Sequence, residues 1–213
     1  MHDNLPNTGI NSQLIAFDFS YSNFQSHLVV GELFLLKWLE DNNYNYNMIC
    51  DDDLHKNPNI LNNYKTFVLH CHPEYWSQEM LQGLFYYLDN GGKTMYLGGN
   101  ALYWKTTINN NQIEVRKDSS FHTHSAEKGG LWINLANYIF PIPTTEKIIG
   151  HWYDSSSYDR NNYYPYEIIN SEHWIFNNIT NTIIGTDNLN CESEQENKGA
   201  SGWEVDNSIL DTT

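Results

Sequence analysis

Apolar runs and helical repeats alternate along the first half of the chain. Apolar residues recur every three or four positions over residues 25–40 and again after Ser77, which predicts an amphipathic helix in each place. The acidic stretch that begins at Asp51 predicts a short helix, because aspartates favour the N-terminal end of a helix dipole. Strands are predicted from short apolar runs at residues 12–19, 46–50, 66–70 and 93–97. This βαβαβαβ order predicts an α/β fold with a doubly wound, mostly parallel sheet.

The helix after Ser77 has clear start and stop signals. Ser77 is a favourable N-cap residue, Glu79 lies in the first turn, and Gly91-Gly92 is expected to end the helix. A helix of this length between two apolar runs is typical of the connection between parallel strands. The strands at 66–70 and 93–97 are therefore expected to lie in one sheet.

The second half of the chain has a weaker pattern. Short elements are expected at residues 112–116, 131–139, 182–185 and 203–205. Residues 143–176 are rich in Tyr, Asn and His and show no clear period. We predict a single domain over residues 1–213, with a core at 12–105 and an irregular elaboration at 106–213.

Composition excludes several classes of function. The formal net charge is −15, so the chain should repel phosphate backbones and we expect no nucleic-acid partner. We expect no membrane partner, because no run of about 18 apolar residues occurs. The first residues lack a basic and apolar leader. Three scattered cysteines do not form a disulfide framework, which favours a reducing, cytoplasmic location.

Polar residues gather where two predicted strands end. His70-Cys71-His72-Pro73-Glu74 follows one apolar run, and Gly98-Gly99-Asn100 follows the next. The carboxyl ends of parallel strands meet at one edge of a sheet, where ligands bind in this class of fold. Histidine and carboxylate together can ligate a metal or form an acid–base pair. The alternative is that His70 is a packed strand histidine and Glu74 only begins the next helix.

Other polar positions carry weaker signals. Tyr21 follows the first predicted strand and could ligate ferric iron, although a surface loop is the simpler interpretation. Glu204 lies beside a tryptophan that could return it to the same crevice. The histidines at 122, 124 and 151 are interpreted as solvated. Cys71 lacks the flanking glycines of a nucleophile elbow, which makes a Cys-His acyl-transfer site a minor alternative.

Two motifs resemble a known family. They read His72-Pro73-Glu74-Tyr75-Trp76-Ser77 and Tyr96-Leu97-Gly98-Gly99-Asn100. With shorter agreements between residues 12 and 206, they resemble the large (beta) subunit of N,N-dimethylformamidase and its relatives. The resemblance implies a domain like the class I glutamine amidotransferases, a flavodoxin-like arrangement without the usual cysteine nucleophile. It also implies an iron-dependent hydrolase of small amide C–N bonds.

The resemblance assigns roles to particular residues. Glu74 matches a ligand of a mononuclear iron, and Tyr21 is the best match for a tyrosine ligand. His72, Asn100 and Glu204 match catalytic residues, and a basic residue of the family corresponds to Arg116 or Lys117. The family's other tyrosine ligand lies upstream of the segment matched here, so we expect this chain to be a fragment of a longer family member, the alternative being a divergent member that has lost this ligand.

The resemblance and the residues leave three functions open. The first is the iron-dependent amidase, with a small amide as substrate and with further copies of the chain or a small partner subunit as partners. The second is a non-catalytic amidotransferase-like module that binds a ligand or partner through an incomplete metal site. The third is a hydrolase that uses another metal, with His70 and His72 as ligands.

Overall fold

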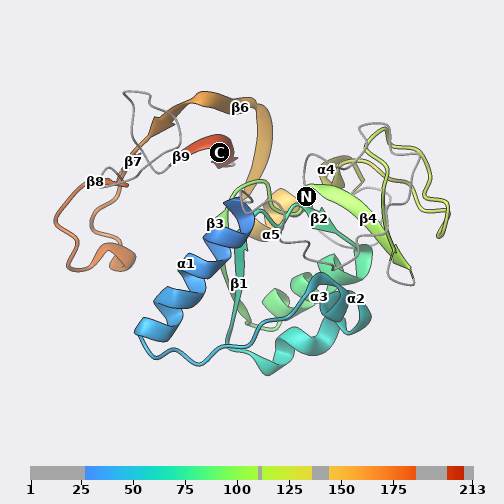
Figure 1. Cartoon of the computed structure of the whole chain (residues 1–213), viewed down its shortest axis with the longest axis horizontal. Coiled ribbons are helices and arrows are strands. Elements are labelled where there is room, and N and C mark those ends of the chain that lie inside the picture. Colours follow the sequence, from blue (N-terminus) through green and yellow to red (C-terminus); the bar gives the residue numbers. More distant parts are fainter. Residues whose placement is uncertain (1–26, 110–111, 136–143, 186–200, 209–213) are drawn as a thin grey trace. The chain divides into compact units, whose positions relative to one another are not determined.

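The computed structural model describes residues 27–109, 112–135, 144–185 and 201–208 (Figure 1). The chain divides into two compact units, of which one is Tyr153–Asn207 and the other combines Met1–Trp152 with Ser208–Thr213. The predicted strand at 12–19 and the candidate ligand Tyr21 lie outside the described residues. The prediction of a single domain stays a prediction.

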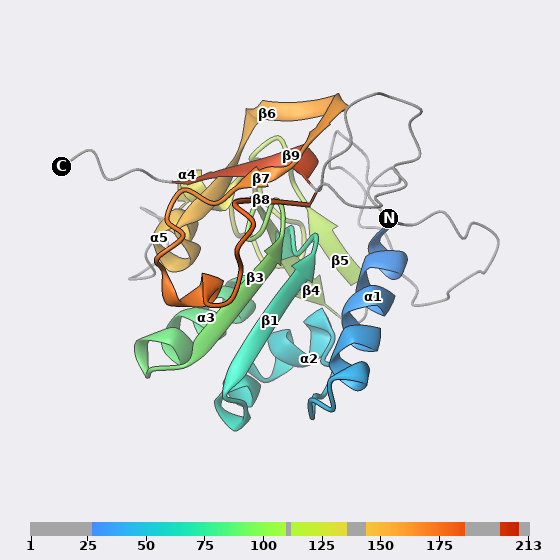
Figure 2. The ribbon, with the colours of Figure 1, turned by 90° about the vertical axis from the view of Figure 1, so that its left-hand side faces the viewer.

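The first unit contains the expected crossover between parallel strands. Strands β1 (Thr66–Cys71) and β3 (Lys93–Gly98) pair in parallel along their whole length, from Thr66 opposite Lys93 to Cys71 opposite Gly98. Figure 2 shows them side by side, with helix α3 (Gln78–Asp89) behind them. The predictions of both strands and of the connecting helix are confirmed. This register brings the ends of β1 and β3 to the same level.

Helix α3 is fixed by its cap and by its buried face. The Ser77 hydroxyl accepts a hydrogen bond from the Met80 backbone N–H at 3.3 Å, as the sequence predicted. The side chain of Leu84 is fully buried. Burial of a leucine of this kind contributes about 1.5–3 kcal/mol. The buried hydrophobic core comprises Leu54, Leu61, Leu69, Trp76, Met80, Leu81, Leu84, Tyr87, Ala101, Leu102, Trp132 and Leu135.

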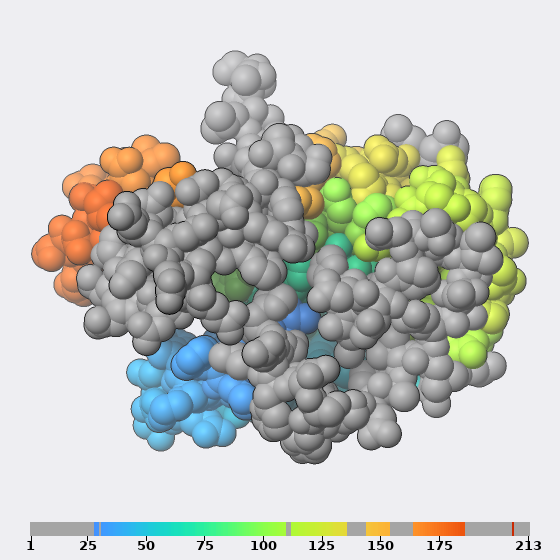
Figure 3. All heavy atoms as spheres, turned by 45° about the horizontal axis from the view of Figure 1, so that its top comes forward, coloured from blue at the N-terminus to red at the C-terminus, as the bar shows by residue number. Residues whose placement is uncertain are grey.

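Helix α1 (His27–Asp41) is the other long helix of this unit, and it confirms the prediction over 25–40. It runs beside β1 (Figure 2). Part of its apolar face remains exposed to solvent. Leu33 and Trp38 are more than half exposed, and Phe34 is 71% exposed. Side chains of α1, drawn in blue, lie at the surface in Figure 3. Its described side chains are all partly or largely exposed, so α1 is weakly packed.

The predicted strand at residues 46–50 is wrong. These residues form no strand in the described part of the chain, and Tyr46 and Met48 are exposed. A strand forms only where a neighbour completes its ladder of hydrogen bonds. Cys50 instead precedes the predicted acidic helix, α2 (Asp51–Lys56), which is confirmed. A 3-10 helix, η2 (Pro58–Asn63), leads into β1.

A three-stranded sheet continues the first unit beyond the crossover. The short strand β2 (Tyr75–Trp76) pairs in parallel with β4 (Trp104–Asn109), which pairs antiparallel with β5 (Gln112–Val115). The predicted strand over 112–116 is thereby confirmed. Helices α4 (Trp132–Leu135) and α5 (Thr145–Ile149) follow. The Trp132 indole N–H donates to the Trp76 carbonyl at 3.1 Å and ties α4 to β2.

The second unit is built from strands. Strand β6 (His151–Tyr164), which starts in the first unit, pairs with β9 (Ser201–Ser208). Strand β7 (Tyr166–Glu167) pairs antiparallel with β8 (Ile183–Ile184), and the 3-10 helix η3 (Trp174–Phe176) lies between them in sequence. The short strands predicted near 182–185 and 203–205 are confirmed. A doubly wound sheet for the whole chain stays a prediction.

No described helix has the length and apolar character to cross a bilayer.

Candidate functional site

The end of β1 leaves the sheet through an unusual backbone. Cys71, its last residue, has a φ of 56°. This left-handed conformation is unfavourable for residues with a Cβ and stops the regular alternation of side chains. A tight turn follows, in which the Glu74 N–H donates to the His72 carbonyl at 2.8 Å. The chain therefore changes direction at the positions where candidate ligands were predicted.

The end of β3 fits closely against this turn. The Gly99 N–H donates to the Cys71 carbonyl at 3.2 Å. A Cβ on Gly98 would lie 2.2 Å from the same carbonyl oxygen, so only glycine is compatible with this approach. Asn100 follows with a φ of 60° and is 1% exposed. The glycines predicted from sequence thus allow two strand ends to meet.

Three of the five predicted site residues come from these two strand ends. The His72 Nδ1 contacts the Gly99 carbonyl oxygen at 3.0 Å, and the His72 Nε2 lies 3.9 Å from Glu74 Oε2. Glu74 is 2% exposed. The backbone N–H groups of Tyr103 and Trp104 both donate to the Glu74 carbonyl, at 3.0 and 2.9 Å. Glu74 is therefore buried beside the chain that follows Asn100 and does not point into bulk solvent.

The histidine contacts define a proton position. A carbonyl oxygen only accepts, so Nδ1 of His72 carries the proton in its contact with Gly99. In the neutral ring Nε2 is then an acceptor, and it faces a carboxylate. Such a pair is complementary when a proton or another cation lies between the two groups. The arrangement suits proton transfer or cation binding.

The side chains of the other two predicted site residues lie outside the described part of the chain. Tyr21 lies outside the described residues. Glu204 belongs to β9 in the second unit, and its side chain is outside the described part of the chain. Their roles stay predictions.

The basic residue implied by the resemblance has two candidates with different surroundings. Arg116 is 5% exposed and its Nε donates to Glu114 at 2.7 Å. The Lys117 Nζ instead lies 5.0 Å from the centre of the Trp104 ring and 5.6 Å from that of Tyr75, which follows Glu74 directly. Lys117 is therefore the candidate with contacts beside the strand-end site.

The solvated interpretation of the loop histidines is wrong for His122. Its side chain is 2% exposed, and its backbone N–H donates to the Glu127 carbonyl at 2.8 Å. The ring Nδ1 contacts the same oxygen at 3.1 Å. Burial lowers the pKa of His122, because charge is unfavourable away from water. The loop folds back on itself and buries His122, although its polar sequence predicted that this side chain would be exposed to solvent.

The other two histidines are exposed. His124 lies on the solvent side of the same loop. His151 is exposed as well, and its ring centre lies 6.0 Å from that of Tyr96. The His124 backbone N–H donates to Glu114 Oε2 at 3.4 Å, a contact that involves the main chain and not the imidazole. Their solvated interpretation is confirmed.

A second cluster involves a residue that the sequence did not single out. The His70 Nδ1 lies 3.6 Å from Glu32 Oε2 on α1 and 3.3 Å from Cys71 Sγ. Burial, followed by the charge of Glu32, raises the pKa of the Cys71 thiol to about 11. A nucleophilic cysteine needs a lowered pKa, so this environment disfavours the Cys-His acyl-transfer alternative. Only the tertiary packing of α1 on β1 reveals Glu32.

The comparisons with known proteins agree with the strand-end motifs. Residues 7–212 match the family described as N,N-dimethylformamidase beta subunit-like, C-terminal. An N,N-dimethylformamidase beta subunit from Alcaligenes sp is 27% identical over 149 residues, and one from Paracoccus aminophilus is 26% identical over the same length. Each alignment covers 63% of this chain and 19% of the relative, so the chain spans about a fifth of the length of these relatives. The chain belongs to the N,N-dimethylformamidase beta subunit-like, C-terminal family.

Proposed function

We propose that the chain supplies catalytic residues to a metal-dependent hydrolase of small amide C–N bonds. The observation that carries the proposal is the meeting of His72 and Glu74 with the segment of Asn100 at two adjoining strand ends. The relatives named N,N-dimethylformamidase beta subunit support amides as the substrate class. We further propose a doubly wound, amidotransferase-like sheet as the scaffold.

The residues present fit an iron ion. Glu74 offers a carboxylate that is 2% exposed, and buried carboxylates are paired or coordinate metals. Carboxylate and tyrosinate oxygens suit ferric iron. Glu74 and Tyr21 would hold the ion. Bound iron supplies a Lewis acid that polarises the amide carbonyl and lowers the pKa of water.

The protein's own groups manage protons and substrate. The Gly99 carbonyl fixes the orientation of the His72 ring and leaves Nε2, which faces Glu74, as the nitrogen that gains and loses a proton. This proton would pass to the leaving amine. The amide of Asn100, held at the end of β3, would orient the substrate carbonyl, and Glu204 would be a second proton carrier.

Burial contributes to the proposed chemistry. Glu74 and Asn100 are 2% and 1% exposed, so bulk water has little access to them. Electrostatic interactions are stronger where water is excluded. The same charge on an exposed loop would polarise an amide carbonyl much less, because water would screen it.

The size of the relatives implies partners. This chain corresponds to 19% of their length, so the complete enzyme would include further segments. The relatives are named as beta subunits, which supports a second kind of subunit in the assembly. We propose a small partner subunit or further copies of this chain as the partners.

The test combines metal analysis with an amide assay on the chain joined to its natural flanking segments. We expect stoichiometric iron with a tyrosinate-to-iron absorption band, and release of amine from small linear amides. Glu74→Gln should abolish both iron and turnover. Glu79→Gln is the matched control, because Glu79 is an exposed residue of α3.

Two outcomes would contradict the proposal. A colourless, metal-free protein without amidase activity would support the non-catalytic binding module. Retention of full iron content and activity in Glu74→Gln would remove Glu74 from the site. A separate substitution, His72→Gln, should lower kcat while leaving iron bound, since His72 is assigned to proton transfer and not to the metal.

A further inference from the structure

A compact set of metal-ligating atoms lies where α1 meets the end of β1. It consists of a carboxylate oxygen of Glu32, Nδ1 of His70 and Sγ of Cys71, and these atoms all lie within 4.8 Å of one another. All three residues are partly buried. The set belongs entirely to the first unit and includes none of the residues of the proposed amidase site.

The backbone at Cys71 explains how neighbouring residues can share one site. In a regular strand, consecutive side chains point to opposite faces of the sheet. The φ of 56° at Cys71 breaks this alternation at the last residue of β1. The Cys71 thiol lies 3.3 Å from the ring nitrogen of the preceding residue, and 3.5 Å from the Leu28 carbonyl oxygen on α1.

Helix α1 approaches closely enough to complete the set. A Cβ on Gly31 would lie 2.4 Å from Cys71 Sγ, so a larger residue at position 31 would displace the thiol. Glu32 is the next residue, and it reaches the His70 ring from the same helix. Glycine at position 31 therefore keeps the space that the sulfur occupies.

The arrangement does not suit a nucleophilic triad. In such a triad the histidine accepts from the nucleophile on one ring nitrogen and donates to the carboxylate from the other. Here the thiol and the carboxylate both approach Nδ1 of His70, at 3.3 and 3.6 Å. Three ligand atoms within 4.8 Å of one another are instead close enough to bind a single metal ion.

We propose that Glu32, His70 and Cys71 bind a zinc ion that clamps α1 to the end of β1. A thiolate, an imidazole and a carboxylate are the ligands that Zn²⁺ takes in proteins, and three protein ligands leave one tetrahedral position for water. The thiol proton leaves to solvent when the metal binds. The clamp would compensate for the weak packing of α1, whose described side chains are not buried. This inference does not depend on the proposed amidase function.

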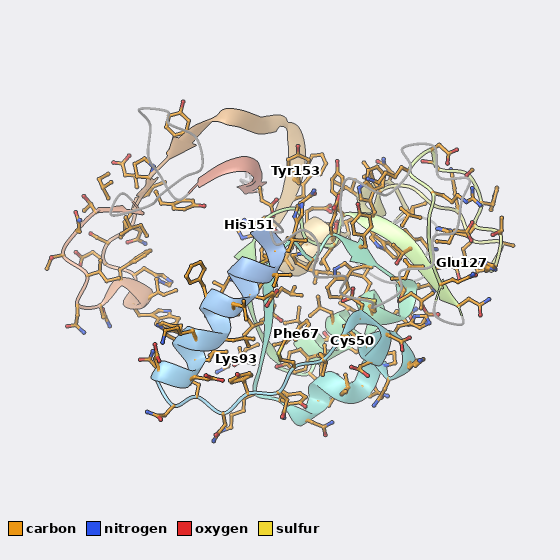
Figure 4. The ribbon with its side chains drawn as sticks, viewed as in Figure 1. Cys50, Phe67, Lys93, Glu127, His151 and Tyr153 are labelled. Carbon is orange, nitrogen blue, oxygen red and sulfur yellow. The ribbon has the colours of Figure 1, made fainter. Side chains whose placement is uncertain are left out.

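The first test uses Co²⁺ as a spectroscopic substitute for Zn²⁺. The double variant Cys50→Ser/Cys191→Ser retains Cys71 as its only cysteine. Cys50, the N-cap residue of α2 (Figure 4), is not a member of the cluster, and its removal ensures that any thiolate-to-cobalt band reports Cys71. After removal of metals with a chelator, titration with Co²⁺ should give a saturable thiolate-to-cobalt band with one ion per chain.

Single substitutions then assign the ligands. Cys71→Ser should abolish the thiolate-to-cobalt band, while Glu32→Gln and His70→Ala should weaken Co²⁺ binding by at least the roughly 10–100-fold that follows loss of an outer-shell partner. Gly31→Ala should weaken binding as well, because its Cβ would displace the Cys71 thiol. Circular dichroism checks that each variant is folded. If Cys71→Ser does not fold, Glu32→Gln, on a half-exposed side chain, decides the question.

The outcomes separate the zinc site from the amidase site. Glu74→Gln should leave the cobalt band unchanged, and Cys71→Ser should leave the tyrosinate-to-iron band unchanged. The zinc proposal is overturned if the double variant gives no saturable cobalt band, if the band survives in folded Cys71→Ser, or if Glu32→Gln binds Co²⁺ with unchanged affinity.

Discussion

Two buried glutamates in the first unit have different electrostatic partners. Glu114 on β5 is fully buried and faces the guanidinium of Arg116, with further hydrogen bonds from the backbone N–H and hydroxyl of Thr123 at 2.9–3.0 Å. Glu74 is 2% exposed, and the ionic partner shown for it is the imidazole of His72 at 3.9 Å. A guanidinium keeps its charge at every accessible pH, whereas an imidazole exchanges a proton near neutrality.

This difference distinguishes Glu114, a carboxylate with a structural role, from Glu74, a carboxylate placed to take part in proton transfer. Burial on its own would raise the pKa of Glu114, but hydrogen bonds from Thr123 and Arg116 outweigh it and hold that pKa below its ordinary value. Glu114 is thus fixed as an anion that joins β5 to the following loop. The contact of Glu74 with His72 instead joins a carboxylate to an imidazole, which is the combination of side chains used for moving protons.

The largest expected effect is on stability at β5. Glu114→Gln should lower the free energy of unfolding by about 3–5 kcal/mol, because it leaves the buried guanidinium of Arg116 without its counter-charge. Urea unfolding followed by circular dichroism measures this. A loss below about 0.5 kcal/mol, the size expected at an ordinary surface position, would show that Glu114 is not structural.

The second expected effect is at the contact between the strand ends. Gly98→Ala should cost about 1–3 kcal/mol, because the new Cβ would meet the Cys71 carbonyl oxygen at 2.2 Å and force the strands apart. Gly91→Ala is a useful comparison, since its Cβ would meet no atom within 4 Å although its φ is 85°. Any loss in Gly91→Ala reports backbone conformation alone. The strand-end fit would be disproved if Gly98→Ala were the more stable variant.

The third prediction concerns pH. Burial lowers the pKa of His122 from 6.5, so as the pH falls below 6.5 the unfolded chain binds a proton that the native chain resists. Stability from this group is therefore present above pH 6.5 and lost on acidification. Replacement of the ring in His122→Asn should flatten the pH dependence of the unfolding free energy in this window. If the unfolding free energy depended on pH with the same slope in the wild-type protein and in His122→Asn, the burial of the His122 ring would be contradicted.

The smallest stability effect is expected at Glu74. Glu74→Gln replaces a buried carboxylate by an amide of nearly the same shape, and the contact of that carboxylate with the His72 ring is long, at 3.9 Å, so the unfolding free energy should change by less than about 1 kcal/mol. The change is measured beside Glu114→Gln under the same conditions. If both substitutions cost the same, the comparison fails and Glu74 is structural as well.

The sequence predicted those parts of the fold that depend on local pattern. Strands β1 and β3 and helix α3 follow from apolar period and from the cap at Ser77, all of which act over a few residues. The strand at 46–50 was predicted from the same kind of run, yet a strand needs a neighbour, and the run itself does not specify one. Local pattern therefore predicts helices with caps better than isolated strands.

The candidate site was predictable to the same extent. His72, Glu74 and Asn100 follow apolar runs directly, and parallel strands that start in register also end together. The position of Glu32 beside His70 depends on how α1 packs against β1, which is a contact between distant residues. The burial of His122 depends on a loop that folds back to Glu127. Neither contact has a signal in the order of polar and apolar residues.

The left-handed backbone of Cys71 and Asn100 has an evolutionary consequence. Glycine would adopt these angles with less strain, yet side chains are present at both positions. Selection for thermal tolerance of the metal-free chain alone should therefore favour glycine at either position wherever the relief of backbone strain exceeds the loss of the side chain's own packing. Selection for turnover or metal retention should resist the same substitutions, so laboratory evolution under the two pressures would diverge at these two codons.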